Sequence, residues 1–124
     1  MPADEVRVAV GIGLRPGTPI GEVRTIVDSV VQPEWTVTVV ATLDRRAGET
    51  AVRELAEHFG VEVRPFTAES LTSVPTATRS AVTAAAVGTS SVAEASALLA
   101  AGVESVLLAR VSNSTVVVAV ASAP

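Results

Sequence analysis

Residues 6–18 read VRVAVGIGLRPGT, an apolar run that passes into a segment with three glycines and an arginine. The run Val6–Val10 is typical of a buried strand, and an amphipathic helical pattern begins directly after Thr18. Junctions of this kind lie at the sheet edge where α/β proteins bind ligands, beside helix N-termini whose free N–H groups favour anions. The stretch therefore predicts an α/β fold and an anion-binding loop at residues 11–18.

The glycines of this loop are not spaced as in the known nucleotide-binding motifs. G-x-G-x-x-G requires a third glycine at position 16, where the chain has proline, and the G-K-[ST] sequence of a P-loop is absent. Glycine lets a backbone approach a ligand or adopt a positive φ, and an arginine side chain forms paired hydrogen bonds to carboxylate or phosphate. The candidate ligand-binding residues are Gly11, Gly13, Arg15, Gly17 and Thr18. In the alternative interpretation, the glycines only permit a tight turn and Arg15 is solvated.

A chain of 124 residues is long enough for one domain, 1–124, with a core of its own. It has no cysteine, which excludes disulfides, thiolate metal sites and thiol catalysis. Its single histidine, His58, excludes a zinc site built from histidines and argues against a Ser-His-Asp triad. All nine basic residues are arginine, so no lysine is present to form a Schiff base. We expect neither a metal site nor a cofactor.

Charge and hydropathy limit the classes of partner. The net charge of −4 and the aromatic content of 2% argue against nucleic acid, which binds basic surfaces with stacking aromatic side chains. The acidic segment Met1–Glu5 is unlike a signal peptide, and no stretch approaches the roughly 20 apolar residues that span a bilayer. These features predict a cytoplasmic protein without a membrane partner.

Apolar periodicity and turn residues predict the element order β-α-β-α-β-α-β-β. The expected strands are Val6–Val10, Trp35–Leu43, Val61–Pro65, Val106–Val111 and Thr115–Ala121, with Ala84–Val87 as a candidate further strand. The expected helices are Pro19–Val31, Ala47–Phe59, Thr67–Leu71 and Ser91–Ala101, and Ser73–Ala81 is expected to be a loop. The chain is thus predicted to form a single layered α/β domain, with a mostly parallel sheet flanked by helices and an antiparallel hairpin at its end.

Residues with known end preferences mark the expected helices. Thr18 is the expected N-cap of the first helix, and Ser91 with Glu94 has the spacing of a capping box. Gly60 and Gly102 follow the second and the last helix as expected stop residues.

Two further segments lie where a loop enters a helix. Thr42–Glu49 follows the second strand, and Val87–Ala95 opens the last helix. Because the carboxyl ends of parallel strands meet at one edge, all three loops are expected to face one ligand. The further candidate ligand-binding residues are Asp44, Arg45, Gly88, Ser90, Ser91, Glu94 and Arg110. Structural alternatives are a helix cap and a surface pair for Asp44 and Glu49, helix capping for Ser91 and Glu94, and an ion pair with a carboxylate for Arg110.

These motifs, taken in order, resemble the cobalamin-biosynthesis family CobE, which corresponds to the C-terminal domain of CbiG. The family pattern runs G-x-G-C-R-x-G-T, a D-x-K-x-x-E-like segment, F-[ST]-A-E-x-L, V-G-x-x-[SG]-V-[AS]-E-A-A-A, a basic residue after a strand, and a closing T-[VL]-A-[IV]-A strand. The matching segments are residues 11–18, 44–49, 66–71, 87–97, Arg110 and 115–121. The match covers nearly the whole chain, and without an N-terminal extension the sequence resembles a stand-alone CobE more than a full-length CbiG.

The chain departs from the family pattern at three positions. Leu14 replaces the usual cysteine, so no thiol chemistry is available there. Arg45 and Arg110 stand where lysine is common, which keeps the charge but removes any role specific to lysine. If the family requires the cysteine, this chain is either inactive or works by binding alone.

The resemblance implies a role in cobalamin (vitamin B12) biosynthesis, and the favoured hypothesis is a non-catalytic protein that binds or carries a corrin or precorrin intermediate. Such tetrapyrroles carry acetate and propionate carboxylates around an apolar ring, which suits arginines, helix N-termini and a small-residue apolar surface. The alternative is a CbiG-like hydrolase that opens the lactone of a precorrin, with Asp44 or Glu49 activating water. A third hypothesis is a regulatory partner of a larger enzyme. Other enzymes of the pathway and a second copy of the chain are further candidate partners.

Overall fold

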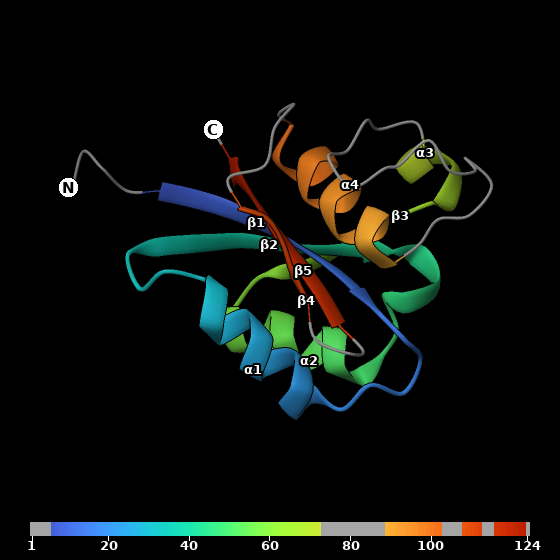
Figure 1. Ribbon diagram of the computed structural model, residues 1–124, viewed down its shortest axis with the longest axis horizontal. Helices are drawn as coiled ribbons and strands as arrows, with labels where there is room; N and C mark the ends of the chain where they lie inside the picture. The colour runs from blue at the N-terminus through green and yellow to red at the C-terminus, as the bar shows by residue number, and fades with distance from the viewer. Residues whose placement is uncertain (1–5, 73–88, 103–107, 113–115, 124) are drawn as a thin grey trace.

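The computed structural model of the chain describes residues 6–72, 89–102, 108–112 and 116–123 (Figure 1). The elements in chain order are β1 (Val6–Leu14), α1 (Ile20–Val30), β2 (Trp35–Leu43), the 3₁₀ turn η1 (Asp44–Arg46), α2 (Thr50–Phe59), β3 (Glu62–Phe66), α3 (Ala68–Thr72), α4 (Thr89–Ala101), β4 (Leu108–Ser112) and β5 (Val116–Ala123). The predicted loop at 73–81 and the candidate strand at 84–87 lie outside the described residues.

The five strands form one sheet in the order β3-β2-β1-β5-β4. β1, β2 and β3 are parallel to one another, and β5 is antiparallel to both of its neighbours, β1 and β4. It follows that β4 runs in the same direction as β1, so that four of the strands point one way. The predicted α/β class, with a mostly parallel sheet that ends in an antiparallel hairpin, is therefore confirmed.

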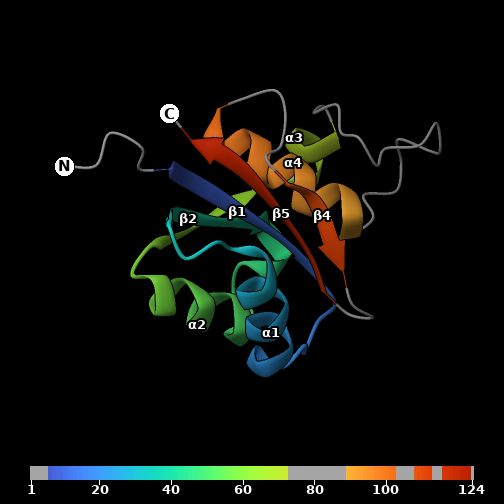
Figure 2. The same cartoon turned by 60° about the vertical axis from the view of Figure 1, so that its left-hand side comes forward.

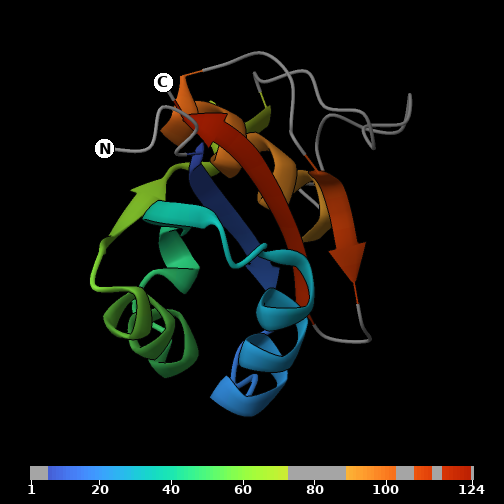
Figure 3. The same ribbon diagram turned by 90° about the vertical axis from the view of Figure 1, so that its left-hand side faces the viewer.

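Helices cover both faces of the sheet. α1 and α2 lie side by side on one face, and α4 lies across the other with α3 beside it (Figures 2 and 3). The larger side chains of β1, such as Val10 and Ile12, pack in the cluster with α1 and α2. On the opposite face, Ala9 packs against Ala93 and Ala97 of α4. The two layers therefore differ in side-chain size, and α4 lies on a surface of small residues.

β1 continues four residues beyond its predicted end at Val10. The prediction that Gly11 and Gly13 belong to a loop is wrong, because both lie inside the strand and are buried. Each is paired with β5, Gly11 with Ala119 and Gly13 with Val117. Strand pairing uses only backbone N–H and C=O groups, which glycine has like other residues.

Gly11 permits the close approach of α4 to the sheet. A Cβ atom built on this residue would overlap the carbonyl oxygen of Ala93 and would lie 2.8 Å from both the Ala97 nitrogen and the Ser96 Oγ. Any side chain at this position would therefore push α4 outward. The sequence thus correctly marks Gly11 as a position that requires glycine, but the reason is the close packing of α4 on the sheet and not a ligand-binding loop.

The predicted helix starts need correction at three places. α1 has Pro19 at its N-cap, without a side-chain cap, and the Thr18 hydroxyl bonds to the preceding turn instead. α2 begins at Thr50 rather than Ala47, because η1 occupies the residues after β2. α4 begins at Thr89, so Ser91 lies inside the helix and is not its N-cap.

The other boundaries agree closely with the sequence pattern. β2 has the predicted limits, and β3 and β5 begin one residue later than expected. Gly60 and Gly102 follow their helices with φ of 69° and 72°, which confirms both as stop residues.

Candidate functional site

The carboxyl ends of β1, β2 and β3 lie at one edge of the sheet, as their parallel pairing requires. The residues after β1 form a type II turn, with Pro16 at its second position and Gly17, at φ 80°, at its third. The Thr18 amide closes the turn on the Arg15 carbonyl oxygen at 3.3 Å, and the Thr18 hydroxyl donates to the same oxygen at 2.7 Å. The turn of residues 15–18 is thus rigidly closed and leaves the Arg15 side chain exposed.

The second segment, residues 44–49, is joined to this turn by one hydrogen bond and to the end of β1 by another. Arg46 Nε donates to the carbonyl oxygen of Leu14 at 3.3 Å. In the opposite sense, the Gly17 N–H donates to Glu49 Oε1 at 2.9 Å. The structure therefore brings the first two motifs together through charged side chains that hold backbone groups. Sequence reasoning missed Arg46, because no local signal distinguishes it from its neighbour Arg45.

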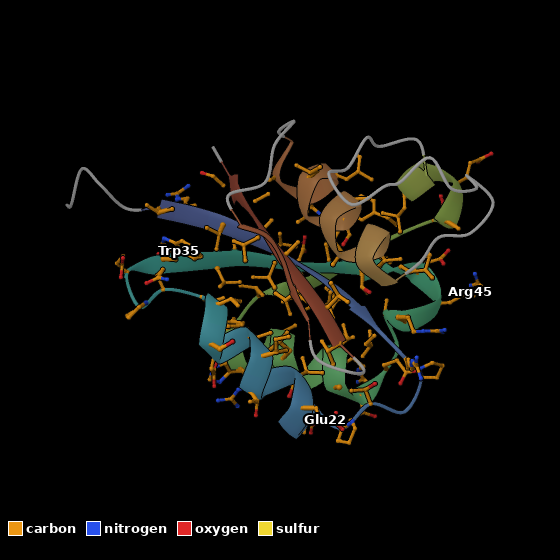
Figure 4. All side chains as sticks on the ribbon, viewed as in Figure 1. Glu22, Trp35 and Arg45 are labelled. Atoms are coloured by element: carbon orange, nitrogen blue, oxygen red, sulfur yellow. The ribbon has the colours of Figure 1, made fainter. Side chains whose placement is uncertain are left out.

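Two arginine side chains at this edge are exposed. Within the described part of the chain, neither Arg15 nor Arg45 forms a side-chain hydrogen bond or an ion pair. Figure 4 shows Arg45 projecting outward from η1. Asp44, the first residue of η1, is exposed as well. The edge thus presents two exposed guanidinium groups, with the exposed carboxylate of Asp44 next to Arg45 in sequence.

The third motif reaches the same edge through α4. Val92 and Ala95 of this helix pack with Leu43, the last residue of β2, and with Leu71 of α3. The first half of α4 therefore lies at the end of β2 where η1 begins.

The remaining candidates are only partly placed. The backbones of Ser90, Ser91 and Glu94 are helical, and Gly88 lies outside the described residues. Arg110 lies within β4, an edge strand that β1 and β5 separate from β2. The backbone at Arg110 is thus separated by two strands from β2, which η1 follows, and by β5 alone from β1, which the first motif follows.

Two fully buried hydroxyl groups hold the layers together beneath the loops, and the sequence reading missed both. Thr42 Oγ1 donates to the Ile12 carbonyl oxygen at 2.7 Å, which links β2 to β1. Ser96 Oγ lies 2.6 Å from the Val92 carbonyl oxygen and 3.3 Å from that of Ala41, which links α4 to β2. These hydroxyls satisfy buried backbone groups and fix the scaffold below the exposed arginines.

Among the residues that the structure describes, few groups at this edge could serve as a general acid or base. Glu49 is engaged by the Gly17 amide, which leaves Asp44 as the carboxylate without a partner among the described residues of the two motifs. His58 lies in the last turn of α2 and stacks edge-on against Phe59. In the ranges that the structure describes, no group of three His, Asp or Glu residues has an arrangement suited to a metal ion. None of the helices there combines the length and hydrophobicity needed to cross a membrane.

The fold and this edge define a small α/β domain that presents arginines where its parallel strands end. The chain belongs to the family described as Cobalamin synthesis G C-terminus, whose model matches residues 8–121. It is 35% identical over 108 residues to Protein CobE of Sinorhizobium sp, an alignment that covers 82% of this chain and 70% of that protein. The chain is therefore a protein of the cobalamin biosynthesis pathway, as its motifs predict.

Solved structures agree with this assignment. The chain resembles cobalamin biosynthesis protein chiG from Agrobacterium tumefaciens str. C58 with 30% identity and a TM-score of 0.65, over 94% of this chain and 98% of that one. CobE, described as a protein from the cobalamin biosynthetic pathway, has the same fold with a TM-score of 0.70 and 20% identity, over 100% and 94% of the two chains. A cobalamin biosynthesis protein G homolog from Sulfolobus solfataricus matches with a TM-score of 0.73 and 21% identity, over 96% of this chain and 37% of that one.

Proposed function

We propose that the chain binds a corrin or precorrin intermediate at the sheet edge where β1, β2 and β3 end. The observation that carries this proposal is the pair of exposed guanidinium groups of Arg15 and Arg45. They lie on neighbouring segments, 14–18 and 44–49, that two hydrogen bonds connect. Corrin intermediates carry acetate and propionate groups around the ring. Two arginines on a rigid support suit two of these carboxylates, because each guanidinium forms paired hydrogen bonds to a carboxylate.

The local charge at this edge is opposite to that of the whole chain. The net charge of the chain is −4, yet residues 15–18 and 44–49 together carry three arginines against two acids, Asp44 and Glu49. A negative protein gains little from long-range steering of an anionic ligand, so capture depends on these local contacts. The arrangement supports recognition of carboxylates and gives no reason to expect binding of a cation.

An apolar surface lies next to the arginines. Phe66 ends β3 directly opposite Leu43, and it is half-buried, as are Ala68 of α3 and Leu99 of α4. These side chains cover the cluster that includes Val92, so part of their apolar area remains accessible. A tetrapyrrole ring that rests on this surface would keep its peripheral carboxylates within the region of η1 and the first turn.

The hydrolase hypothesis rests on Asp44. This carboxylate is exposed and has no partner among the described residues, so it is available to activate a water molecule. Glu49 is a weaker candidate, because its Oε1 already accepts from Gly17. The lone histidine lies at the far end of α2, and so it does not form a base–nucleophile pair with Asp44. Binding without turnover is therefore the better-supported function.

The test is a titration with hydrogenobyrinic acid, a cobalt-free corrin with free carboxylates, followed by the absorbance of the corrin. Arg15→Ala and Arg45→Ala are each expected to weaken binding by about tenfold, the loss of one charge-assisted contact. Arg7→Ala is the matched control, since Arg7 is an exposed arginine near the opposite end of β1. The same corrin with its carboxylates amidated should bind poorly. Equal affinity for the acid and amide forms would refute carboxylate recognition.

A second assay separates binding from hydrolysis. A lactone-bearing precorrin is incubated with the chain, and the mass of the corrinoid is followed over time. An increase of one water that disappears in Asp44→Asn would establish hydrolysis. A corrinoid of unchanged mass that co-purifies with both forms of the protein would support a carrier.

A further inference from the structure

Two charged side chains of segment 44–49 form hydrogen bonds to backbone groups, one in the turn of residues 15–18 and one at the end of β1. Glu49 accepts from the Gly17 N–H at 2.9 Å, and Arg46 Nε donates to the Leu14 carbonyl oxygen at 3.3 Å. In one bond the 44–49 segment accepts and in the other it donates. Their partners, Leu14 and Gly17, lie on either side of Arg15 in the sequence. Hydrogen bonds with a charged partner are stronger than neutral ones, which makes this pair an effective connection even near the surface.

The Gly17 amide is the group that an anionic ligand would otherwise use in this turn. Gly17 has the positive φ that the third position of a type II turn requires. Its N–H already donates a hydrogen bond to Glu49. The Gly17 N–H and Glu49 Oε1 are therefore already paired with each other and do not point to a ligand. Arg15 and Arg45, by contrast, have no partner within the described residues.

We infer that Glu49 and Arg46 are positioning residues that set the spacing between the guanidinium groups of Arg15 and Arg45. This inference rests on the proposed binding of corrin carboxylates. The two bonds hold segment 14–18, which carries Arg15, against segment 44–49, which carries Arg45. Two carboxylates of one ligand would then meet guanidinium groups at a preset spacing, and the second contact would form at little extra entropic cost. The ligand class is thus a polycarboxylate with its acid groups at a fixed spacing on a rigid ring.

The deciding variants are Glu49→Gln and Glu49→Ala. Glutamine keeps a carbonyl oxygen that accepts from Gly17, whereas alanine removes the acceptor. Affinity for hydrogenobyrinic acid is expected to fall about tenfold in Glu49→Ala and to stay within about threefold in Glu49→Gln. In the ligand-free protein, amide hydrogen exchange at Gly17, measured by NMR, is expected to accelerate in the alanine variant and to remain slow with glutamine.

Two results would overturn the inference. If Glu49→Gln binds as weakly as Glu49→Ala, then the carboxylate itself acts on the ligand. If Glu49→Ala binds as tightly as the unsubstituted chain, or more tightly, then the connection is dispensable or obstructs the site.

The exchange measurement keeps the inference separate from the proposed function. Failure of the unsubstituted chain to bind any corrin would refute the function, and unchanged exchange at Gly17 in Glu49→Ala would then also refute the inference. Corrin binding that persists undiminished in Glu49→Ala would refute the inference alone. A thermal unfolding curve for each variant excludes loss of folding as the cause.

Discussion

Gly11 of β1 lies directly beneath Ser96 of α4, so closely that a Cβ on the glycine would be 2.8 Å from the serine Oγ. The same hydroxyl lies 2.6 Å from the Val92 carbonyl oxygen and 3.3 Å from that of Ala41. A single contact region therefore joins α4 to β1 and β2. The preceding turns of α4, with Val92 and Ala95, then pack against Leu43 at the end of β2, where η1 begins.

The first prediction concerns this contact. Gly11→Ala is expected to lower the free energy of unfolding by about 3 kcal/mol, at the upper end of the range for overpacking, because the new methyl group overlaps backbone atoms of α4. Urea denaturation measures the change. Gly21→Ala is the control: Gly21 is exposed in α1 with nothing within 4 Å of the added Cβ, so a gain of about 1 kcal/mol is expected there. Equal effects at both positions would contradict the packing argument.

The second prediction tests a buried hydroxyl. Thr42→Val keeps the shape of the side chain but leaves the Ile12 carbonyl oxygen without the hydroxyl donor. A loss of about 1 to 2 kcal/mol in the free energy of unfolding is expected, since the group is fully buried. Thr36→Val, at an exposed position of the same strand, should change stability by less than about 0.5 kcal/mol.

The third prediction concerns salt. Raising the ionic strength from about 0.1 M to about 1 M shortens the Debye length from about 10 Å to about 3 Å. Binding of hydrogenobyrinic acid should weaken strongly over this range, because exposed guanidinium groups make the contacts. The double variant Arg15→Ala/Arg45→Ala should bind weakly at all salt concentrations, with little further change. Salt-independent binding by the unsubstituted chain would show that apolar contacts dominate.

The fourth prediction uses the single tryptophan. Trp35 begins β2 and Leu43 ends it, which places them about 26 Å apart at the rise of an extended strand. Figure 4 shows Trp35 and Arg45 at opposite ends of the molecule. Trp35→Phe should therefore leave corrin affinity unchanged within about twofold, a difference below about 0.5 kcal/mol. A larger loss of corrin affinity in a folded variant would indicate that the ligand binds near Trp35 and not at η1.

Local sequence patterns predict many of the structural elements of this protein. The β-branched run Trp35–Leu43 has the limits of β2, because such residues suit an extended strand packed on both faces. Gly60 and Gly102 end helices as predicted, because only glycine adopts positive φ without cost. The order of the loop motifs likewise identified the family, which the match over residues 8–121 bears out.

Local patterns failed where the partner of a residue lies far along the chain. Gly11 has a loop-like sequence context, but the sheet and α4 determine its environment. Thr18 has the sequence of an N-cap, yet its hydroxyl closes a turn. Arg45 and Arg46 are neighbours of identical chemistry, and only the position of β1 decides that Arg46 bonds to Leu14.

The sequence by itself determined the strands, the helix stops, the family and the presence of arginines at strand ends, because periodicity, φ preference and residue type act within a few neighbours. Tertiary structure alone decided which of those residues hold the scaffold and which remain available. The bond from Gly17 to Glu49 spans 32 positions and depends on β1 and β2 lying side by side in their register. That register follows from the packing of the whole sheet between its helices, and no single segment contains it.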